Sequence, residues 1–288
     1  NLVLTLSADV IHHRLLRMIT QFNQVPQEPT TPRKLGKYMC VPFGKILRGK
    51  VVPNTVTKTL HTDKVYEPDL NSFTIEPFPY YSPLKSQIET IKSFDRPVIL
   101  VDDLVHKADR LQALAPSLKK AGIPVKKVVV GVISGYGRDL METFHLPVES
   151  IYSMPNLRQW FVESTLYPFI GGDTVRREEM KVAGLQPSIN MILPYATPRL
   201  SGCSREALVE FSACCIENSK NLFQVLEAEY RKMYAKNLTL SRLSEAVILP
   251  LCPDKGSCME YDENLAASVY LENDLETLWR MKEFLIKG

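Results

Sequence analysis

The sequence lacks the features that mark secretion or membrane insertion. None of its six cysteines forms a CxxC pair, and Cys252 and Cys258 have no second pair at zinc-finger spacing. It contains no run of about 18 apolar residues, so no transmembrane helix is predicted. The opening NLVLTLSADV has no basic segment, and Ser7 and Asp9 interrupt its apolar run, so no signal peptide is predicted. We therefore expect reduced cysteines and a cytoplasmic protein.

The sequence also lacks an initiator methionine, a strong excess of one charge and an internal repeat. Its first residue is Asn1, which suggests a processed product or one domain of a longer polypeptide. The net charge is only +3 over 288 residues, and the basic residues are scattered among acidic ones rather than forming an aromatic-interleaved stripe. Nucleic-acid binding is therefore not expected. A small phosphate-bearing ligand is neither required nor excluded by this charge.

What the sequence does contain is a regular alternation of apolar runs and amphipathic segments in its middle third. PVILVDD (97–103), KKVVVGVIS (126–134) and PVESIYS (147–153) have the apolar character of buried strands. The segments between them, at 108–122 and 137–145, have helical spacing. Strands that alternate with helices at this spacing indicate parallel strands joined by crossover helices. The predicted fold class is therefore α/β with a central parallel sheet.

Further elements are predicted on both sides of this core. Helices are expected at 8–23 and 83–95, a short strand at 37–45, and extended structure with loops at 48–82. The C-terminal third is expected to be mostly helical. A long helix at 204–237 is followed by two more at 240–249 and 273–287. The buried face of the long helix is expected to carry Leu208, Phe211, Cys215, Leu222, Leu226 and Tyr230.

These elements suggest three parts. Residues 1–34 would form an N-terminal helix and linker, and residues 35–175 the α/β core. Residues 176–288 would form a mostly helical region packed on that core. A homodimer, or contact with a neighbouring domain of a longer chain, is a possible use of the C-terminal helices.

Two adjacent carboxylates, Asp102 and Asp103, follow the apolar run of the first core strand. They are expected at the carboxyl end of an interior parallel strand, which is where open α/β sheets bind ligands. The acidic pair is therefore the first candidate for a functional site.

The acidic pair and the segments around it resemble the type I phosphoribosyltransferases of the orotate and purine-salvage kind. In that family an apolar strand leads into two acidic residues, two further residues and a Thr- and Gly-rich loop at a helix start. CVPFGK (40–45) resembles the family's earlier loop, which approaches the pyrophosphate of phosphoribosyl pyrophosphate, and GYGRDLMETFHLPVESIY (135–152) follows in the family's order. The resemblance covers roughly residues 35–155.

The resemblance implies a set of roles. Asp102 and Asp103 would be the catalytic pair that accepts hydrogen bonds from the ribose hydroxyls of phosphoribosyl pyrophosphate or a nucleoside monophosphate. Mg²⁺ would be bound through the ligand's phosphates. The ligand-binding residues implied by the resemblance or by their position are Pro42, Gly44, Lys45, Lys58, His106, Lys107, Arg110, Gly135, Tyr136 and Arg138. The last two would lie near an acceptor base.

The sequence departs from the family at the 5′-phosphate loop. Where the family has a Thr-Gly-Gly-Thr-like loop, this chain has His106-Lys107-Ala108-Asp109-Arg110, without glycine. Lys107 and Arg110 could replace amide contacts with charge, whereas Asp109 would oppose an anion. The family's flexible loop has no clear counterpart, although Lys58, His61 and Lys64 could supply cations there.

Three functional alternatives remain open. The chain could be an active phosphoribosyltransferase (a glycosyltransferase in class), a nucleotide-sensing or scaffold domain that binds without turnover, or an empty fold. A response-regulator receiver also has paired acids, but Ile151 stands where its phospho-acceptor aspartate is needed. Two minor candidates are His12-His13, expected to be solvated, and the loop 167–174, expected to cap a following helix or to complete the pocket with Arg176 and Arg177.

Overall fold

The computed structural model describes residues 3–176, 186–197, 202–243, 247–250 and 261–287. By its internal contacts the chain divides into two units, which are treated separately below. Unit 1 comprises residues 1–63 and 75–158, and unit 2 comprises residues 64–74 and 159–288. The helix expected to form a separate N-terminal part belongs to unit 1.

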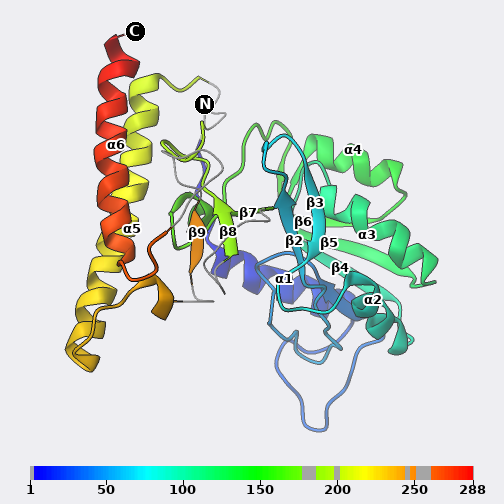
Figure 1. The fold of residues 1–288 in the computed structure, drawn as a ribbon. Coiled ribbons are helices and arrows are strands. Elements are labelled where there is room, and N and C mark those ends of the chain that lie inside the picture. Colours follow the sequence, from blue (N-terminus) through cyan, green and yellow to red (C-terminus); the bar gives the residue numbers. More distant parts are fainter. Residues whose placement is uncertain (1–2, 177–185, 198–201, 244–246, 251–260, 288) are drawn as a thin grey trace. The chain divides into compact units, whose positions relative to one another are not determined.

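Unit 1 is built on a four-stranded sheet. Its strands are β1 (Met39–Pro42), β4 (Val98–Val105), β5 (Val125–Ser134) and β6 (Val148–Met154), in the order β1-β4-β5-β6. Each neighbouring pair is parallel. The predicted α/β class with a central parallel sheet is therefore confirmed (Figure 1).

Helices cover the sheet of unit 1, which explains the buried apolar runs at 98–101 in β4 and 128–133 in β5. The helices are α1 (Ala8–Phe22), α2 (Leu84–Ser93), α3 (Asp109–Lys120) and α4 (Gly135–Thr143). Alternate residues of β4 join different clusters, because successive side chains of a strand point to opposite faces. Ile99 and Val101 pack with Ile11, Leu15 and Ile19 of α1. On the other face, Val98 and Leu100 pack with residues of α2 and α3, including Ile88, Ile91, Leu111, Leu114 and Leu118.

The second sheet has five strands in the order β3-β2-β7-β8-β9. They are β3 (Phe73–Pro77), β2 (Thr62–Tyr66), β7 (Asp173–Val175), β8 (Gln186–Ile189) and β9 (Ile248–Pro250). β2 pairs with β7 in parallel, β7 with β8 antiparallel, and β8 with β9 in parallel. The extended structure expected in 48–82 therefore includes two strands, β2 and β3.

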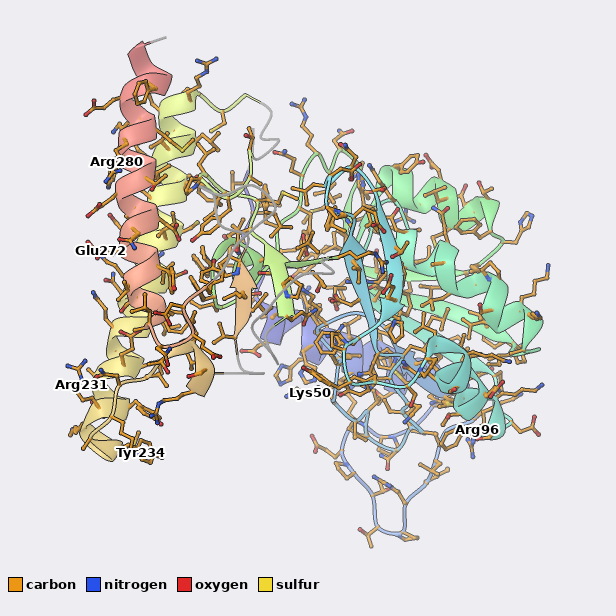
Figure 2. All side chains as sticks on the ribbon, viewed as in Figure 1. Lys50, Arg96, Arg231, Tyr234, Glu272 and Arg280 are labelled. Carbon is orange, nitrogen blue, oxygen red and sulfur yellow. The ribbon has the colours of Figure 1, made fainter. Side chains whose placement is uncertain are left out.

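Two long helices, α5 (Arg205–Tyr234) and α6 (Ala267–Lys287), form most of the helical C-terminal region. They run antiparallel, because Lys220 pairs with Glu272 at 2.7 Å while Glu227 accepts a hydrogen bond from the backbone N–H of Ser268. Figure 2 shows Glu272 along α6. None of the described helices combines the length and the apolar character needed to span a bilayer.

Two expectations for this region are wrong. Of residues 240–249, the described ones form a 3-10 turn at Leu240–Arg242 and part of the strand β9 instead of the expected α-helix. The β-branched Val247 and Ile248, followed by Pro250, favour a strand. The buried face of α5 is also different, since Leu222 and Leu226 are 46% and 45% exposed. Its buried residues are Val209, Ser212, Ala213, Cys215, Ile216, Ser219 and Phe223.

The described cysteines are free thiols, as expected. Cys40 and Cys215 are buried, whereas Cys203 and Cys214 are exposed. Burial raises the pKa of Cys215 to about 12, so this thiol stays protonated at neutral pH. Cys252 and Cys258 lie outside the described residues.

Candidate functional site

The acidic pair lies near the carboxyl end of β4, an interior strand of the parallel sheet. Asp102 stands opposite Val130 of β5, and the strand continues to Val105. Asp102 is only 6% exposed. Both residues lie within β4, Asp102 three residues and Asp103 two residues before Val105, so the strand continues past the pair that the sequence placed at its end.

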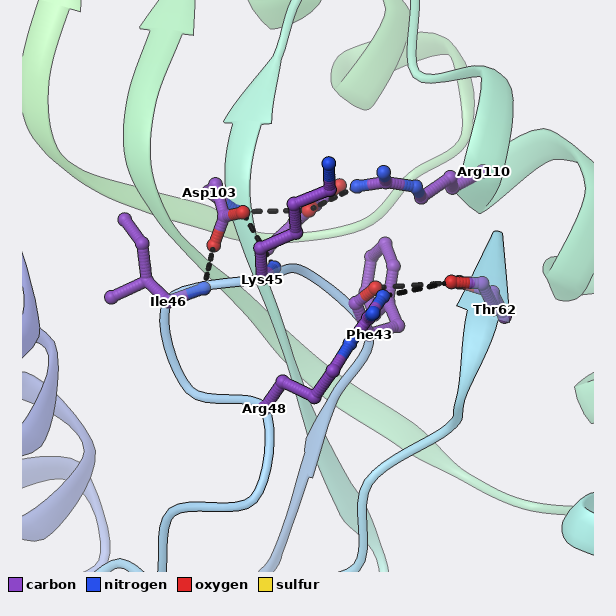
Figure 3. Close-up of polar contacts among 8 residues, drawn as sticks. Phe43, Lys45, Ile46, Arg48, Thr62, Asp103 and Arg110 are labelled. Atoms are coloured by element: carbon purple, nitrogen blue, oxygen red, sulfur yellow. Dashed lines mark hydrogen bonds and ion pairs between the residues drawn. The ribbon is translucent and has the colours of Figure 1, made fainter. Parts of the chain in front are cut away.

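The loop that follows β1 wraps closely around both carboxylates. We call residues 43–46 the glycine loop. The backbone N–H of Lys45 donates to Asp103 Oδ2 at 2.6 Å, and that of Ile46 donates to Asp103 Oδ1 at 2.9 Å (Figure 3). A Cβ added at Gly44 would lie 2.5 Å from Asp103 Oδ1 and 2.6 Å from Asp102 Oδ1. Gly44 is therefore required by close approach, and the loop amides already hold an anion, the carboxylate of Asp103.

Asp102 is held differently. Its Oδ1 accepts a hydrogen bond from the backbone N–H of Asp103 at 2.8 Å and lies 3.4 Å from the Arg110 guanidinium. The pKa of Asp102 is raised to about 7, mainly by burial; Arg110 opposes this rise, and the charge of Asp103 adds to it. The structure thus keeps a carboxyl group where its charged form is poorly solvated, a property common at functional sites.

A second loop, residues 106–110, follows the carboxylates; we call it the cation loop. Ala108 has φ of 55°, in the left-handed region, and no side chain caps the start of α3. The side chain of Lys107 is exposed, whereas that of Arg110 turns to Asp102. The cation loop therefore offers charge rather than a glycine-rich phosphate cradle.

The end of β5 brings a third group of predicted residues beside the cation loop. His106 Nδ1 lies 2.8 Å from Ser134 Oγ, and that hydroxyl also accepts the backbone N–H of Gly137 at 2.9 Å. The rings of His106 and Tyr136 meet edge to face with centroids 6.1 Å apart. Three segments far apart in sequence therefore meet near the carboxyl ends of β4 and β5.

The remaining predicted ligand-binding residues are placed as follows. Pro42 is buried in β1, and its carbonyl accepts the backbone N–H of Leu60 at 2.9 Å. Lys45 and Lys58 are exposed. Gly135 begins α4, where a Cβ would lie 2.7 Å from the Pro155 carbonyl oxygen. Arg138 donates to Ser153 Oγ at 3.2 Å.

The sequence did not reveal a cluster of one cation and three rings beside the glycine loop. Arg48 donates to the Thr62 carbonyl at 2.9 Å, and its guanidinium carbon lies 4.6 Å from the centroid of the Phe78 ring. His61 and Tyr81 stack with centroids 3.7 Å apart. Burial lowers the pKa of His61, as do Arg48 and Lys58, so this ring is neutral at pH 7 and does not supply the expected charge. No sequence signal joins residues this far apart.

The minor candidates lie elsewhere or outside the described residues. His13 Nδ1 lies 2.8 Å from the Asp9 carbonyl within α1, and its ring meets that of His12 edge to face with centroids 5.4 Å apart. Among the described residues, the two belong to no group of three His, Cys, Asp or Glu side chains that could hold a metal ion. Arg176 pairs with Glu67 at 3.2 Å within unit 2. The segment 167–174 leads into β7, and the helix expected after it, with Arg177, lies outside the described residues.

Comparisons with known proteins give little further information. No family model matches the chain, and no curated protein matches it. Among solved structures, a purine phosphoribosyltransferase from Pyrococcus horikoshii Ot3 is similar at 12% identity with a TM-score of 0.29, covering 54% of this chain and 91% of that one. A likeness at this level does not establish a family.

Proposed function

We propose that unit 1 binds the phosphoribosyl group of a nucleoside monophosphate at Asp102 and Asp103. The observation that carries this proposal is the carboxylate pair near the carboxyl end of β4. The glycine loop encloses the pair, and it can approach this closely only because residue 44 is a glycine. A carboxylate offers about four lone-pair positions. The glycine loop uses two of those on Asp103. The others can accept vicinal ribose hydroxyls.

The ionisation of Asp102 supports a ligand that donates hydrogen bonds. In the free protein, burial disfavours its charged form and raises its pKa. Ribose hydroxyls that donate to this carboxylate would stabilise the charged form and lower that pKa. Ligand binding would then release protons near neutral pH, where Asp102 is partly protonated.

The 5′-phosphate would lie at the cation loop. The first turn of α3 has no side-chain cap, so its N–H groups can be shared with a ligand. Lys107 adds an exposed positive charge. Asp109 in the same turn weakens this attraction, so we expect modest affinity for the phosphate.

Binding without turnover fits the geometry better than phosphoribosyl transfer. The amides of Lys45 and Ile46, which the resemblance assigns to the pyrophosphate side, hold the carboxylate of Asp103. A pyrophosphate would have to displace it. Transfer of the phosphoribosyl group to a base remains the second candidate, and it would rest on positioning and charge stabilisation at C1.

Magnesium would enter with the ligand rather than with the protein. Within the described ranges, no three His, Cys, Asp or Glu side chains are arranged to hold a metal ion. Mg²⁺ commonly uses one or two carboxylates together with substrate phosphates and water. Asp102 and Asp103 fit that limited role, in which the ion would neutralise phosphate charge.

A thermal-shift titration tests the proposal. Nucleoside monophosphates, and phosphoribosyl pyrophosphate with Mg²⁺, are titrated against the wild type and the Asp102→Asn/Asp103→Asn double variant. At a hundredfold excess over its dissociation constant, a ligand that binds only the folded state stabilises it by about 2.7 kcal/mol. We expect this stabilisation with a monophosphate in the wild type and its loss in the double variant.

The matched control is Asp95→Asn/Asp139→Asn, which removes two exposed carboxylates of unit 1. This variant should respond to the ligand like the wild type. The proposal would be contradicted if no phosphoribosyl ligand stabilised the wild type. It would also be contradicted if the ligand stabilised the Asp102→Asn/Asp103→Asn variant as much as the wild type. Release of pyrophosphate in the presence of a purine or pyrimidine base would show a transferase instead.

A further inference from the structure

An aromatic cluster lies beside the glycine loop and has no role in the proposed function. We call His61, Phe78 and Tyr81, together with Arg48, the ring cluster. His61 precedes β2, and the two other rings belong to the turn after β3, in which the Tyr81 N–H donates to the Phe78 carbonyl at 3.1 Å. All four residues belong to unit 1.

The ring cluster is held in place by a buried glutamine. Gln87 of α2 accepts the backbone N–H of His61 at 2.8 Å and donates to the carbonyls of His61, at 3.3 Å, and Ser82, at 2.7 Å. The Phe78 N–H donates to the His61 carbonyl at 2.9 Å. The segments that carry His61 and Tyr81 are therefore fixed relative to each other before any ligand arrives.

The cluster presents an aromatic surface to solvent. Tyr81 is 48% exposed and its neighbour Tyr80 is 82% exposed. His61 stacks on Tyr81 with an angle of 15° between the ring planes. A fixed, half-exposed tyrosine ring supported by a second ring suits stacking with a flat aromatic ligand, since every nucleobase has a π-face.

Two buried nitrogen atoms of the cluster have no hydrogen-bond partner. They are Arg48 Nε and His61 Nδ1, two of the four such side-chain atoms among the described residues. A buried donor left unpaired is unfavourable, because it has lost its hydrogen bonds to water without gaining a partner. A ligand that brings an acceptor to Arg48 would supply the missing partner, and a carbonyl oxygen on the edge of a flat ring is such an acceptor.

Arg48 also connects the ring cluster to the carboxylates. It follows the glycine loop directly, and Figure 3 shows it extending from that loop toward Thr62. Its guanidinium lies within electrostatic range of Asp103 and of Tyr81. The ribose site and the ring cluster are therefore neighbours in unit 1.

We propose that the ring cluster receives the nucleobase of the ligand whose ribose binds at Asp102 and Asp103. This inference rests on the proposed function and adds the substrate class: a nucleotide whose base carries a ring carbonyl. The base stacks on Tyr81, and Arg48 Nε–H donates to the carbonyl oxygen. Tyr136 was expected near a base, but its neighbours are less suited to bind one. Among the described residues, none of the four buried side-chain atoms without a hydrogen-bond partner belongs to His106, Ser134 or Arg138.

Calorimetric titration with three probes tests this inference. Inosine and uridine 5′-monophosphates carry a ring carbonyl, and ribose 5-phosphate has no base. Stacking is worth about 1–3 kcal/mol per base, so the wild type should bind the nucleotides at least about fivefold more tightly than ribose 5-phosphate. Tyr81→Leu should abolish that preference without weakening ribose 5-phosphate binding.

Two further variants separate stacking from general damage. Tyr81→Phe keeps the ring and should keep the preference. Phe94→Leu removes another partly exposed ring of unit 1, at the end of α2, and should also keep it. Folding of each variant is checked by its unfolding midpoint.

The outcomes distinguish this inference from the function on which it rests. Ribose 5-phosphate binding that depends on Asp102 and Asp103, with no preference for a nucleotide, would overturn the base site alone. A preference that survives in Tyr81→Leu would also overturn it. Absence of binding by all three probes would overturn both proposals.

Discussion

The two loops that flank the carboxylate pair differ in how they contact it, one through its backbone and the other through charged side chains. The glycine loop approaches through its backbone: Gly44 leaves room, and two N–H groups hold Asp103. The cation loop has no glycine, takes a left-handed conformation at Ala108, and presents the side chain of Lys107, while Arg110 turns to Asp102. One loop is complete without a ligand, whereas the other exposes a charge and an uncapped helix start.

This difference suggests that the two loops have different roles in the site. The glycine loop positions the carboxylate of Asp103, because its two hydrogen bonds to that carboxylate are short and come from the chain itself. The cation loop would be the part that receives an anion from solution under the proposed function. Changes in the first should therefore affect folding and binding together, and changes in the second should affect binding or stability only weakly.

The largest combined effect, on stability and on binding, is expected for Gly44→Ala. The new Cβ would come within 2.6 Å of both carboxylates, so the loop or the aspartates must move and the two amide contacts with Asp103 are lost. We expect a loss of about 3 kcal/mol in the free energy of unfolding, together with loss of ligand binding. Urea unfolding and thermal-shift titration measure the two effects.

Gly49→Asn is the control for Gly44→Ala. Gly49 has φ of 70° and no atom within 4 Å of an added Cβ, and asparagine tolerates this backbone conformation. Its stability and ligand response should stay close to those of the wild type. A Gly44→Ala protein with unchanged stability would show that the carboxylates are not enclosed as described.

The effect expected next, for Asp102→Asn, is on stability and depends on pH. The folded state keeps the Asp102 proton up to a pKa of about 7, whereas the unfolded chain loses it near 4. The wild type therefore loses stability from this group as the pH rises from about 4 to about 7, and the loss is complete above that range. Asp102→Asn removes this component.

The stability of the variant relative to the wild type should therefore rise between pH 4.5 and pH 8, by up to roughly 4 kcal/mol, because the pKa of about 7 already includes the effect of Arg110. Unfolding in urea at several pH values measures the difference. Asp139 is an exposed carboxylate of α4, so the stability of Asp139→Asn should change with pH as that of the wild type does. If the stability of Asp102→Asn also followed the wild type at every pH, the pKa of Asp102 would not be raised in the folded protein.

The smallest effect is expected for Ala108→Gly in the cation loop. The left-handed conformation of Ala108 costs about 1–2 kcal/mol, and glycine relieves it at some cost in backbone entropy. Glycine also removes the Ala108 methyl group, which is buried in the core of unit 1. We therefore expect a net gain of no more than about 0.5 kcal/mol in stability, measured by urea unfolding. Ala235→Gly, at the exposed left-handed end of α5, should gain more, and only Ala108→Gly should also change phosphate affinity.

The core of unit 1 could be predicted because burial on both faces makes a parallel strand apolar throughout. Val98–Val101 of β4 are all buried, and that run is visible in the sequence. The buried face of α5 could not be read in the same way. Small residues such as Ser212, Ala213 and Ser219 face its core, whereas the larger Leu222 and Leu226 face solvent. Side-chain size was a poor guide there.

Only the part of the candidate site that follows an apolar strand could be predicted from the sequence. Asp102 and Asp103 follow from their place after an apolar run. Their contacts with the glycine loop cross 57 and 58 positions of sequence, and no local pattern specifies them. The stacking of His61 on Tyr81 was missed for the same reason. Arg110 pairs with Asp102 at 3.4 Å instead of serving as a free cation, and the sequence alone does not show this pairing.

The carboxylate of Asp103 on the amides of Lys45 and Ile46 acts as a tethered competitor. A group held near its receptor by the chain competes at an effective concentration in the millimolar range or above. Inorganic phosphate and pyrophosphate in solution would face that competition for every amide of the loop. A ribose whose hydroxyls bind to Asp103 itself would not. The same aspartate would thus exclude small free anions while selecting the sugar to which a phosphate is attached.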